Sequence, residues 1–183
     1  MEETTATADE QDRDLVRRYL EGQQDAAGGL IDRYQKCLFN VALRMLDNAQ
    51  DAEDVTQTVF LNAFDKLRTY DPSYRFFSWV YRMTVNESLN VLRRRKGIVA
   101  LEDIPVPGAA ADRSAEVQDR VGKALMQLKP DDRAVVVLRH FVSFSYEEIA
   151  DVLEVPVKTV KSRLFEARER LRLTLREIET SSS

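Results

Sequence analysis

Four side chains near the C-terminus fall on one face of a predicted helix, at spacings of three, four and seven residues. They are Lys158, Lys161, Ser162 and Phe165. An α-helix fits the major groove of DNA, where a lysine can read guanine, a hydroxyl can bond to a base or a phosphate, and an apolar ring can meet a thymine methyl group. Arg163, Arg168 and Arg172 flank this face and suit phosphate oxygens. This chemistry would read duplex DNA, and the alternative is a solvated cationic surface.

The segment FSYEEIADVLEVPVKTVKSRLFEARERL contains the elements that would position these side chains. Ser145, with Glu148 three residues later, forms a capping box and predicts a helix over 146–153. A turn of about three residues then leads to a longer helix over about 157–178. The apolar positions that can pack the two helices together are Ile149, Val152, Leu153, Val157, Val160, Leu164, Ala167 and Leu171. The pattern predicts a helix-turn-helix, with a plain helical hairpin as the alternative.

A second candidate surface lies in RTYDPSYRFFSWVYRMTVNESLNVLRRRK, which predicts a turn over 70–74 and a helix over about 76–95. Its aromatic residues are Tyr70, Tyr74, Phe76, Phe77, Trp79 and Tyr81. Trp79 falls in line with a polar stripe made of Arg82, Asn86, Asn90 and Arg93. Rings beside cations suit single-stranded nucleic acid, because unstacked bases lie on the rings and the cations pair with phosphates. The alternative is that the rings are core, and we expect this for Phe76 and Tyr81.

A third segment, DAEDVTQTVFLNAFDKL, predicts an amphipathic helix that Asn48 can cap. Its buried stripe would be Val55, Val59, Ala63 and Leu67. Asp51, Glu53, Asp54 and Gln57 occupy its early turns. Taken alone, this pattern indicates a solvated acidic helix surface.

Charge is distributed unevenly along the 183 residues, whose net charge is −4. Residues 1–67 carry 7 basic and 14 acidic side chains, and residues 97–154 carry 6 and 11. Residues 68–96 and 155–176 each carry 7 basic and 2 acidic side chains. Two separate basic segments in an acidic protein predict two contacts with one polyanion.

The composition argues against an enzyme, a metal site and a bound cofactor. The chain has one histidine, His140, for which we expect a structural role, and it has no glycine-rich phosphate loop and no Cys/His cluster with metal-ligand spacing. Its single cysteine, Cys37, lies among apolar residues and is expected to be buried and inert. One cysteine excludes an internal disulfide and fits the cytoplasm. No apolar run approaches the length of a membrane span.

Helical periodicity also dominates the rest of the chain, and strand-like alternation is almost absent. Further helices are predicted over about 12–21, 25–46, 49–69, 115–128 and 130–142. Gly28-Gly29 leaves a break possible in the second of these. The stretch KGIVALEDIPVPGAAADRSAE has no periodic face and predicts a flexible linker. We therefore expect an all-α fold of two small helical domains, residues 1–96 and 115–183, joined by a linker over 97–114.

The order of these segments resembles an extracytoplasmic-function (group IV, sigma-70 family) RNA polymerase sigma factor over residues 12–176. DAEDVTQTVF is similar to the family's core-polymerase-binding helix, FFSWVYRMTVNESLNVLRRR to its −10 element helix, and SYEEIADVLEVPVKTVKSRLFEARERLR to its −35 element helix-turn-helix. The resemblance implies a protein that binds core RNA polymerase and directs promoter-specific transcription initiation. It would read the −35 element as duplex and open the −10 element.

The resemblance also implies roles for particular residues. Core polymerase would be bound by Asp51, Glu53, Asp54, Gln57, Thr58 and Leu61. The −10 element would be bound by Tyr74, Phe77, Trp79, Arg82, Asn86, Asn90 and Arg93. The −35 element would be bound by Lys158, Thr159, Lys161, Ser162, Arg163, Phe165 and Arg168. The implied partners are the β′ clamp helices and β flap of the polymerase, promoter DNA and an anti-sigma factor, with no membrane contact of its own and no small-molecule substrate.

Four positions depart from the family pattern. Thr58 stands where the family often has an acid, Phe77 where it is often basic, and Glu154 and Lys158 where it often has glycine. Glu154 in a left-handed turn is expected to be strained by roughly 1 kcal/mol. Two other classes of protein were weighed against the sigma factor. A plain helix-turn-helix regulator leaves the N-terminal half unexplained, and a helical adaptor that binds only protein leaves both basic segments unexplained.

Overall fold

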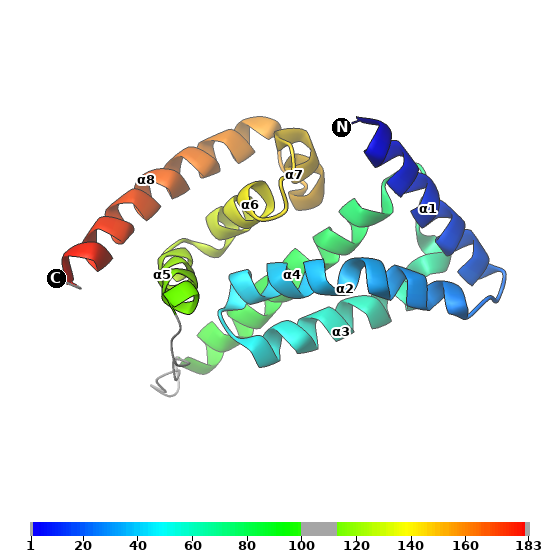
Figure 1. Ribbon diagram of the computed structural model, residues 1–183, viewed down its shortest axis with the longest axis horizontal. Helices are drawn as coiled ribbons and strands as arrows, with labels where there is room; N and C mark the ends of the chain where they lie inside the picture. The colour runs from blue at the N-terminus through cyan, green and yellow to red at the C-terminus, as the bar shows by residue number, and fades with distance from the viewer. Residues whose placement is uncertain (1, 100–112, 182–183) are drawn as a thin grey trace.

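Helices make up all the regular structure in the part of the chain that the computed structural model describes, residues 2–99 and 113–181. Side chains are described for residues 8–95 and 120–176. In chain order the elements are α1 (Glu2–Leu20), α2 (Asp25–Leu46), α3 (Ala49–Lys66), the 3-10 turn η1 (Leu67–Thr69), α4 (Phe76–Val99), α5 (Arg113–Met126), α6 (Pro130–His140), α7 (Tyr146–Leu153) and α8 (Val157–Ser181) (Figure 1). The expected all-α class is confirmed.

The N-terminal half is built on α2, α3 and α4, which pack against one another, with α1 packed mainly on α2 (Figure 1). Asn48 caps α3 by accepting a hydrogen bond from the Asp51 N–H at 2.9 Å. The stripe predicted for α3 is buried at every position, Val55, Val59, Ala63 and Leu67. Local capping and helical periodicity therefore determine which face of α3 meets the core.

The helix α2 is continuous from Asp25 to Leu46, so the break considered at Gly28-Gly29 does not occur. Gly29 lies where α1 crosses α2, and a Cβ atom at this position would meet Leu15 Cδ2 at 2.9 Å. A Cβ at Gly28 would have nothing within 4 Å. Gly29 thus allows the close approach of the two helices, whereas Gly28 faces open space.

We expect Gly28→Ala to raise the free energy of unfolding by about 0.5–1 kcal/mol, because alanine loses less backbone entropy in a helix. Gly29→Ala should gain clearly less, since its new methyl group would displace Leu15. Urea denaturation followed by circular dichroism measures both variants. Equal increases in the free energy of unfolding would show that the close approach of α1 and α2 does not depend on glycine at position 29.

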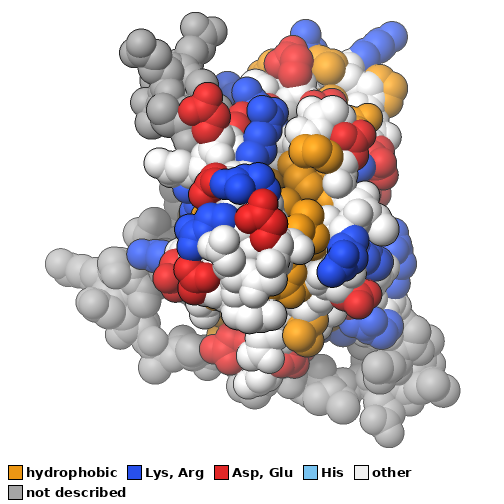
Figure 2. Space-filling model, turned by 90° about the vertical axis from the view of Figure 1, so that its right-hand side faces the viewer, with side chains coloured by type: hydrophobic (Ala, Val, Ile, Leu, Met, Phe, Trp, Pro, Cys, Tyr) orange, Lys and Arg blue, Asp and Glu red, His pale blue; other side chains and the backbone are white. Residues whose placement is uncertain are grey.

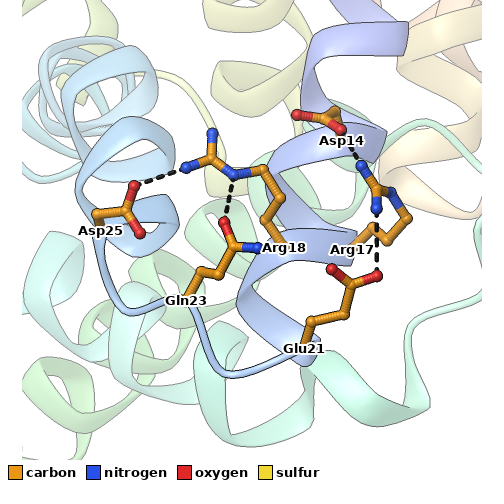
Figure 3. A network of polar contacts seen from close by, with 6 residues as sticks. All are labelled: Asp14, Arg17, Arg18, Glu21, Gln23 and Asp25. Carbon is orange, nitrogen blue, oxygen red and sulfur yellow. Dashed lines mark hydrogen bonds and ion pairs between the residues drawn. The ribbon is translucent and has the colours of Figure 1, made fainter.

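The helix α1 begins at Glu2 rather than near Asp12 as predicted, and side chains from distant parts of the chain contact its middle. Arg75 pairs with Asp9 at 3.1 Å, and Arg33 donates to Gln11 at 2.8 Å. At its other end, Arg18 donates to Gln23 at 2.8 Å and to Asp25 at 2.6 Å, which closes the turn into α2 (Figure 3). On this side of the molecule, charges of both signs surround a strip of hydrophobic side chains (Figure 2).

The C-terminal half contains the helices α5 to α8. Pro130 is at the start of α6, with Asp131 and Asp132 in the first turn, as the sequence predicts. The predicted capping box of α7 is confirmed, because the Ser145 hydroxyl accepts from the Glu148 N–H at 3.1 Å and the Glu148 carboxylate accepts from the Ser145 N–H at 2.8 Å. These local contacts fix where α6 and α7 begin.

Arg133 on α6 is only 4% exposed, and its guanidinium group is satisfied by backbone carbonyls. It donates to the carbonyls of Leu125 at 2.9 Å, Met126 at 3.1 Å and Leu128 at 3.2 Å, at the end of α5. A fourth bond goes to the carbonyl of Met45 near the end of α2. Desolvation by burial lowers the pKa of Arg133 to about 10, so it is charged at neutral pH. One side chain therefore ties together helix ends from both halves of the chain.

The two halves pack against each other and share one continuous hydrophobic core. Phe144, between α6 and α7, lies 5.2 Å from the Phe77 ring and 5.0 Å from the Tyr81 ring of α4. The Arg44 guanidinium of α2 lies 3.7 Å from the centroid of the Phe141 ring. The expected linker, 97–114, is helical at both ends, since α4 runs to Val99 and α5 begins at Arg113. The rest of it, 100–112, lies outside the described residues.

The sequence-based expectation for Cys37 is wrong, because this side chain is exposed on α2. Tyr34 and Leu38, which flank it on the helix, are buried. Burial raises the pKa of the Tyr81 hydroxyl, and Cys37 lies close enough to this group to help raise that pKa. His140 is likewise exposed, at the end of α6 rather than in the core. Partial burial, with the positive charges of Arg168 and Arg139, lowers its pKa.

Candidate functional site

The first candidate surface, called here the acidic face, lies on the outer side of α3. It consists of Glu53, Asp54, Gln57 and Leu61, all of which are exposed. Leu61 is 72% exposed and gives this face one apolar side chain. Exposed carboxylates around one exposed apolar side chain suit a protein partner that offers basic residues around an apolar patch.

Asp51 and Thr58 were predicted to belong to the same surface, and the structure places them differently. Asp51 is half-buried and forms an ion pair with Arg95 of α4. Arg95 also donates to the Leu46 carbonyl at 3.0 Å. Thr58 is half-buried between the outer and inner faces of α3. Asp51 therefore has a partner on another helix, whereas Asp54 is exposed and accepts only a long bond of 3.4 Å from Gln50 of its own helix.

The second surface, called here the aromatic–basic surface, begins at the turn before α4. Tyr70 and Trp79 have ring centroids 5.1 Å apart, and Phe76 and Trp79 5.8 Å apart. Phe76 and Tyr81 are buried, as expected, and Trp79 is half-buried in the same cluster. The Trp79 ring is therefore partly structural, with only its remaining surface available to a ligand.

Tyr74 is the most exposed ring of this turn, at 65%. The Tyr70 hydroxyl donates to the backbone carbonyl of Tyr74 at 2.5 Å, and the Asp71 carboxylate accepts from the Ser73 N–H at 2.9 Å. Desolvation raises the pKa of Tyr70 to about 12, and the hydrogen bond from the Ser73 backbone lowers the pKa of Asp71. The turn is thus held by its own polar contacts and presents the Tyr74 ring to solvent.

The polar stripe of α4 continues the aromatic–basic surface. Asn86 and Arg93 are exposed, and Asn90 is half-buried. The Asn90 amide group donates to Glu87 at 3.2 Å and accepts from Arg93 at 2.8 Å. Arg82 and Phe77, in contrast, contact the other half of the chain. The structure therefore leaves only part of the predicted stripe open to solvent.

The predicted helix-turn-helix is formed by α7 and α8. Ile149, Val152, Val160 and Leu164 are buried between them. The turn begins at Glu154, which has φ 54° and ψ 43° and so adopts the predicted left-handed conformation. This conformation suits glycine, and a residue with a Cβ atom is strained there. The packing fixes which face of α8 is directed outward.

The outward side of α8 is called here the cationic face. Its exposed residues are Lys158, Lys161, Ser162, Phe165 and Arg168. Phe165 is 70% exposed, although aromatic rings are normally buried. Thr159 and Arg163 are half-buried, and the Lys161 ammonium lies 5.8 Å from the Tyr146 ring centroid. The face combines cations, a hydroxyl group and an apolar ring, which together suit the major groove of DNA.

A cleft of about 1420 Å³ lies beside the contact between the aromatic–basic surface and the other half of the chain. Its lining comes from both halves and includes Tyr74, Trp79, Arg82, Phe144, Glu148 and Asp151. The sequence identified the first three of these residues. It did not identify Phe144 or Asp151, and it identified Glu148 only as part of the capping box, because contacts between distant segments leave no periodic signal.

Two further features follow from the described residues. Within 2–99 and 113–181, no helix is both long enough and apolar enough to cross a membrane. Over the same part of the chain, no cluster of three or more His, Cys, Asp or Glu side chains could hold a metal ion.

Known proteins resemble this chain over most of its length. Sigma-70 region 2 matches residues 30–98, and Sigma-70 region 4 matches residues 118–171. RNA polymerase sigma-H factor of Pseudomonas aeruginosa is 35% identical over 177 residues, covering 87% of this chain and 91% of that protein. ECF RNA polymerase sigma-E factor of Escherichia coli strain K12 is 32% identical over 174 residues, covering 86% and 91%.

Two solved structures share the fold. CnrH in complex with the cytosolic domain of CnrY has a TM-score of 0.73 and 29% identity, covering 91% of this chain and 98% of that chain. The sigma factor RpoE in complex with the anti-sigma factor NepR from Bartonella quintana has a TM-score of 0.69 and 25% identity, covering 81% and 96%.

The chain has a helical N-terminal half that matches Sigma-70 region 2, followed by a helix-turn-helix that matches Sigma-70 region 4. This arrangement defines a transcription initiation factor rather than an enzyme. The chain belongs to the sigma-70 family and, within it, to the extracytoplasmic-function RNA polymerase sigma factors.

Proposed function

We propose that this chain joins core RNA polymerase in the cytoplasm and directs it to promoters. Residues 1–96 form the domain that binds core polymerase and opens the −10 element, and residues 115–183 form the domain that reads the −35 element as duplex. One observation supports this most strongly: a single chain carries an exposed acidic face, an aromatic–basic surface and a cationic face on a helix-turn-helix. Strand opening needs no catalytic group, because binding of extruded bases offsets the cost of unstacking.

The surfaces suit different partners. The acidic face fits the β′ clamp helices, and the C-terminal domain reaches the β flap. The turn before α4, with its exposed Tyr74, receives a base from the opened strand. The cationic face enters the major groove at the −35 element.

An anti-sigma factor is the further partner that we propose. Both structural relatives described above were solved as complexes, and one of them contains an anti-sigma factor by name. Such a partner would cover the surfaces that polymerase and DNA use.

Transcription reconstituted with purified core polymerase tests the proposal. The holoenzyme should produce a promoter-specific transcript from genomic DNA fragments, whereas core polymerase alone should not. A plain helix-turn-helix regulator would bind DNA without core polymerase and would give no such transcript. Failure to bind core polymerase would exclude the sigma-factor function.

Charge reversal on the acidic face is the matching mutational prediction. Asp54→Lys should weaken assembly with core polymerase at least about tenfold, because a basic partner surface would then meet a like charge. Asp32→Lys, which reverses an exposed carboxylate on α2, should have little effect. Fluorescence anisotropy of the labelled chain titrated with core polymerase measures both. Equal affinities of the two variants would place the interface elsewhere.

A further inference from the structure

Glu166 is a negatively charged side chain at the edge of the cationic face of α8. It is exposed and directly follows Phe165, which is 70% exposed. The other carboxylate of α8 within residues 157–176 is Glu169, and it pairs with Arg172 at 3.0 Å. Among the residues whose side chains the structure describes, none forms an ion pair or a hydrogen bond with the Glu166 carboxylate. Glu166 is therefore an unpaired anion beside the face that would meet a polyanion.

Contacts within the chain give Glu166 a like charge for a neighbour. Arg163 and Arg170 stand at the helical spacings where ion pairs commonly form, yet neither pairs with it. Instead, Glu166 lies near Asp132 of α6. Burial raises the pKa of Asp132, and the negative charge of Glu166 raises it further. Because like charges repel, the packing of α6 on α8 does not explain a carboxylate at this position.

The place of Glu166 on the helix allows it to reach a base. Lys158, Ser162 and Glu166 are each four residues apart, so they lie in one row along α8. At 1.5 Å per residue this row is about 12 Å long, and the major groove of B-DNA is about 12 Å wide. The last residue of the row can therefore meet a base edge as well as the first.

The chemistry of a carboxylate selects the base. An ionised carboxylate accepts hydrogen bonds and donates none. In the major groove guanine presents only acceptors, thymine presents an acceptor and a methyl group, and adenine presents an acceptor beside its amino donor. Cytosine presents only the donor of its N4 amino group. Glu166 is thus complementary to cytosine and repelled, wholly or in part, by the other bases.

The neighbouring Phe165 ring makes this choice stricter. When the exposed ring packs against a base, it also excludes water from the carboxylate beside it. A charged group that loses water without gaining a hydrogen bond costs free energy. Sequences without cytosine at the contacted position are therefore disfavoured by an unpaired charge.

We propose that Glu166 is a specificity-determining residue of the helix-turn-helix, whose carboxylate accepts a hydrogen bond from the N4 amino group of a cytosine in the −35 element. The inference rests on the proposed function, since it needs the cationic face to enter the major groove there. The cations of this face attract any duplex, and Glu166 lowers the affinity wherever cytosine is absent. A carboxylate that only faced water would instead lower the affinity for all sequences alike.

Holoenzyme binding to duplexes randomised across the −35 element tests this assignment, with sequencing of the bound and free fractions. The parent should prefer cytosine at one position. Glu166→Ala should reduce that preference about fivefold, the lower end of what a base contact contributes. Its affinity for the other bases should stay equal or rise, because a negative charge is removed. Alanine favours helix and position 166 is exposed, so this variant should fold.

Two further variants separate base readout from charge. Glu169→Ala is the matched control, because it removes the same charge from the same helix at a position that is already paired. It should change the affinity for all library members by one common factor. Glu166→Asp keeps the charge but shortens the side chain. It should lose the cytosine preference and keep the salt dependence of the parent.

A modified base tests the hydrogen bond itself. N4-methylcytosine retains pairing with guanine and has a methyl group in place of the N–H that faces the major groove. At the position identified by the library, this base should weaken binding of the parent holoenzyme about fivefold. Glu166→Ala should bind the methylated and unmethylated duplexes equally.

The proposal is overturned if Glu166→Ala keeps the base preferences of the parent at every position, or if it changes the affinity for all sequences alike. Equal weakening of parent and variant by N4-methylcytosine would overturn it as well. Each of these results leaves selective −35 binding by the parent, and with it the proposed function, intact. A parent holoenzyme without any −35 preference would remove the −35 role and this inference together.

Discussion

Arg133→Met should lower the free energy of unfolding by about 3–5 kcal/mol, because it removes several buried hydrogen bonds from a charged donor, each worth about 1.5–3 kcal/mol. Methionine fills a similar volume but has no donor. The carbonyls of Leu125, Met126, Leu128 and Met45 would each lose their bond from Arg133 in a region that excludes water. The Leu125 carbonyl keeps its bond from the Leu128 N–H at 3.1 Å. A buried acceptor that is left without a donor costs about 1–3 kcal/mol, and repacking offsets part of the sum. Chemical denaturation monitored by circular dichroism measures the difference in free energy of unfolding between the variant and the parent.

Arg139→Met is the matched control for this change. Arg139 is also on α6 and donates to one carbonyl, that of Phe144, at 2.7 Å, and it is only half-buried. Loss of this hydrogen bond should lower the free energy of unfolding by about 1 kcal/mol. Similar costs for the two variants would show that the buried network of Arg133 contributes no more than a single hydrogen bond. Arg133→Lys should fall between them, because an ammonium group reaches fewer carbonyls than a guanidinium group.

On the cationic face, Lys158→Ala should weaken binding of the holoenzyme to its own −35 element by about 1–3 kcal/mol, roughly 5- to 150-fold. Lys158 is exposed in the first turn of α8, and the first residues of a recognition helix contact base edges. The loss of affinity should be confined to −35 sequences that carry the one or two base pairs contacted by Lys158. The preference for those base pairs should therefore become weaker. Binding to a small library of −35 sequences measures this.

Arg168→Ala provides the contrasting result. Arg168 is exposed farther along α8 and suits a phosphate. Its loss should weaken all library members alike and reduce the slope of log affinity against log salt by about one. Holoenzyme binding at several salt concentrations separates the two patterns. If Lys158→Ala and Arg168→Ala gave the same profile, the cationic face would contribute charge without sequence readout.

The sequence predicted most of the fold because the signals that place these helices are local. Pro130, the Asn48 cap and the Ser145 capping box act within one helical turn, and the observed helices begin where they indicate. The face that each helix buries follows from its period. The same reasoning located the exposed residues of the acidic and cationic faces. The left-handed turn at Glu154 was instead expected from the family resemblance, because the family often has glycine at this position.

The features that the sequence did not predict depend on contacts between distant segments. Arg133 begins the run RAVVVL, and its place beside these apolar residues was the one signal that it is buried. Nothing near Asp51 indicates Arg95 as its partner, because the pair joins different helices. Trp79 shares a stripe with polar residues, yet its ring packs on Tyr70. A helical period predicts the direction in which a side chain points, but it does not predict which residue of another helix lies there.

The bond from Arg133 to the Met45 carbonyl also has a consequence for synthesis of the chain. Donor and acceptor are 88 residues apart. A ribosome that adds roughly 5–20 residues per second needs on the order of ten seconds to make this stretch. During that time the end of α2 has no donor from α6, and α7 does not yet exist to cover α4. The N-terminal half therefore emerges from the ribosome uncovered, and translation itself sets a period in which it can meet polymerase before the rest of the chain closes over it.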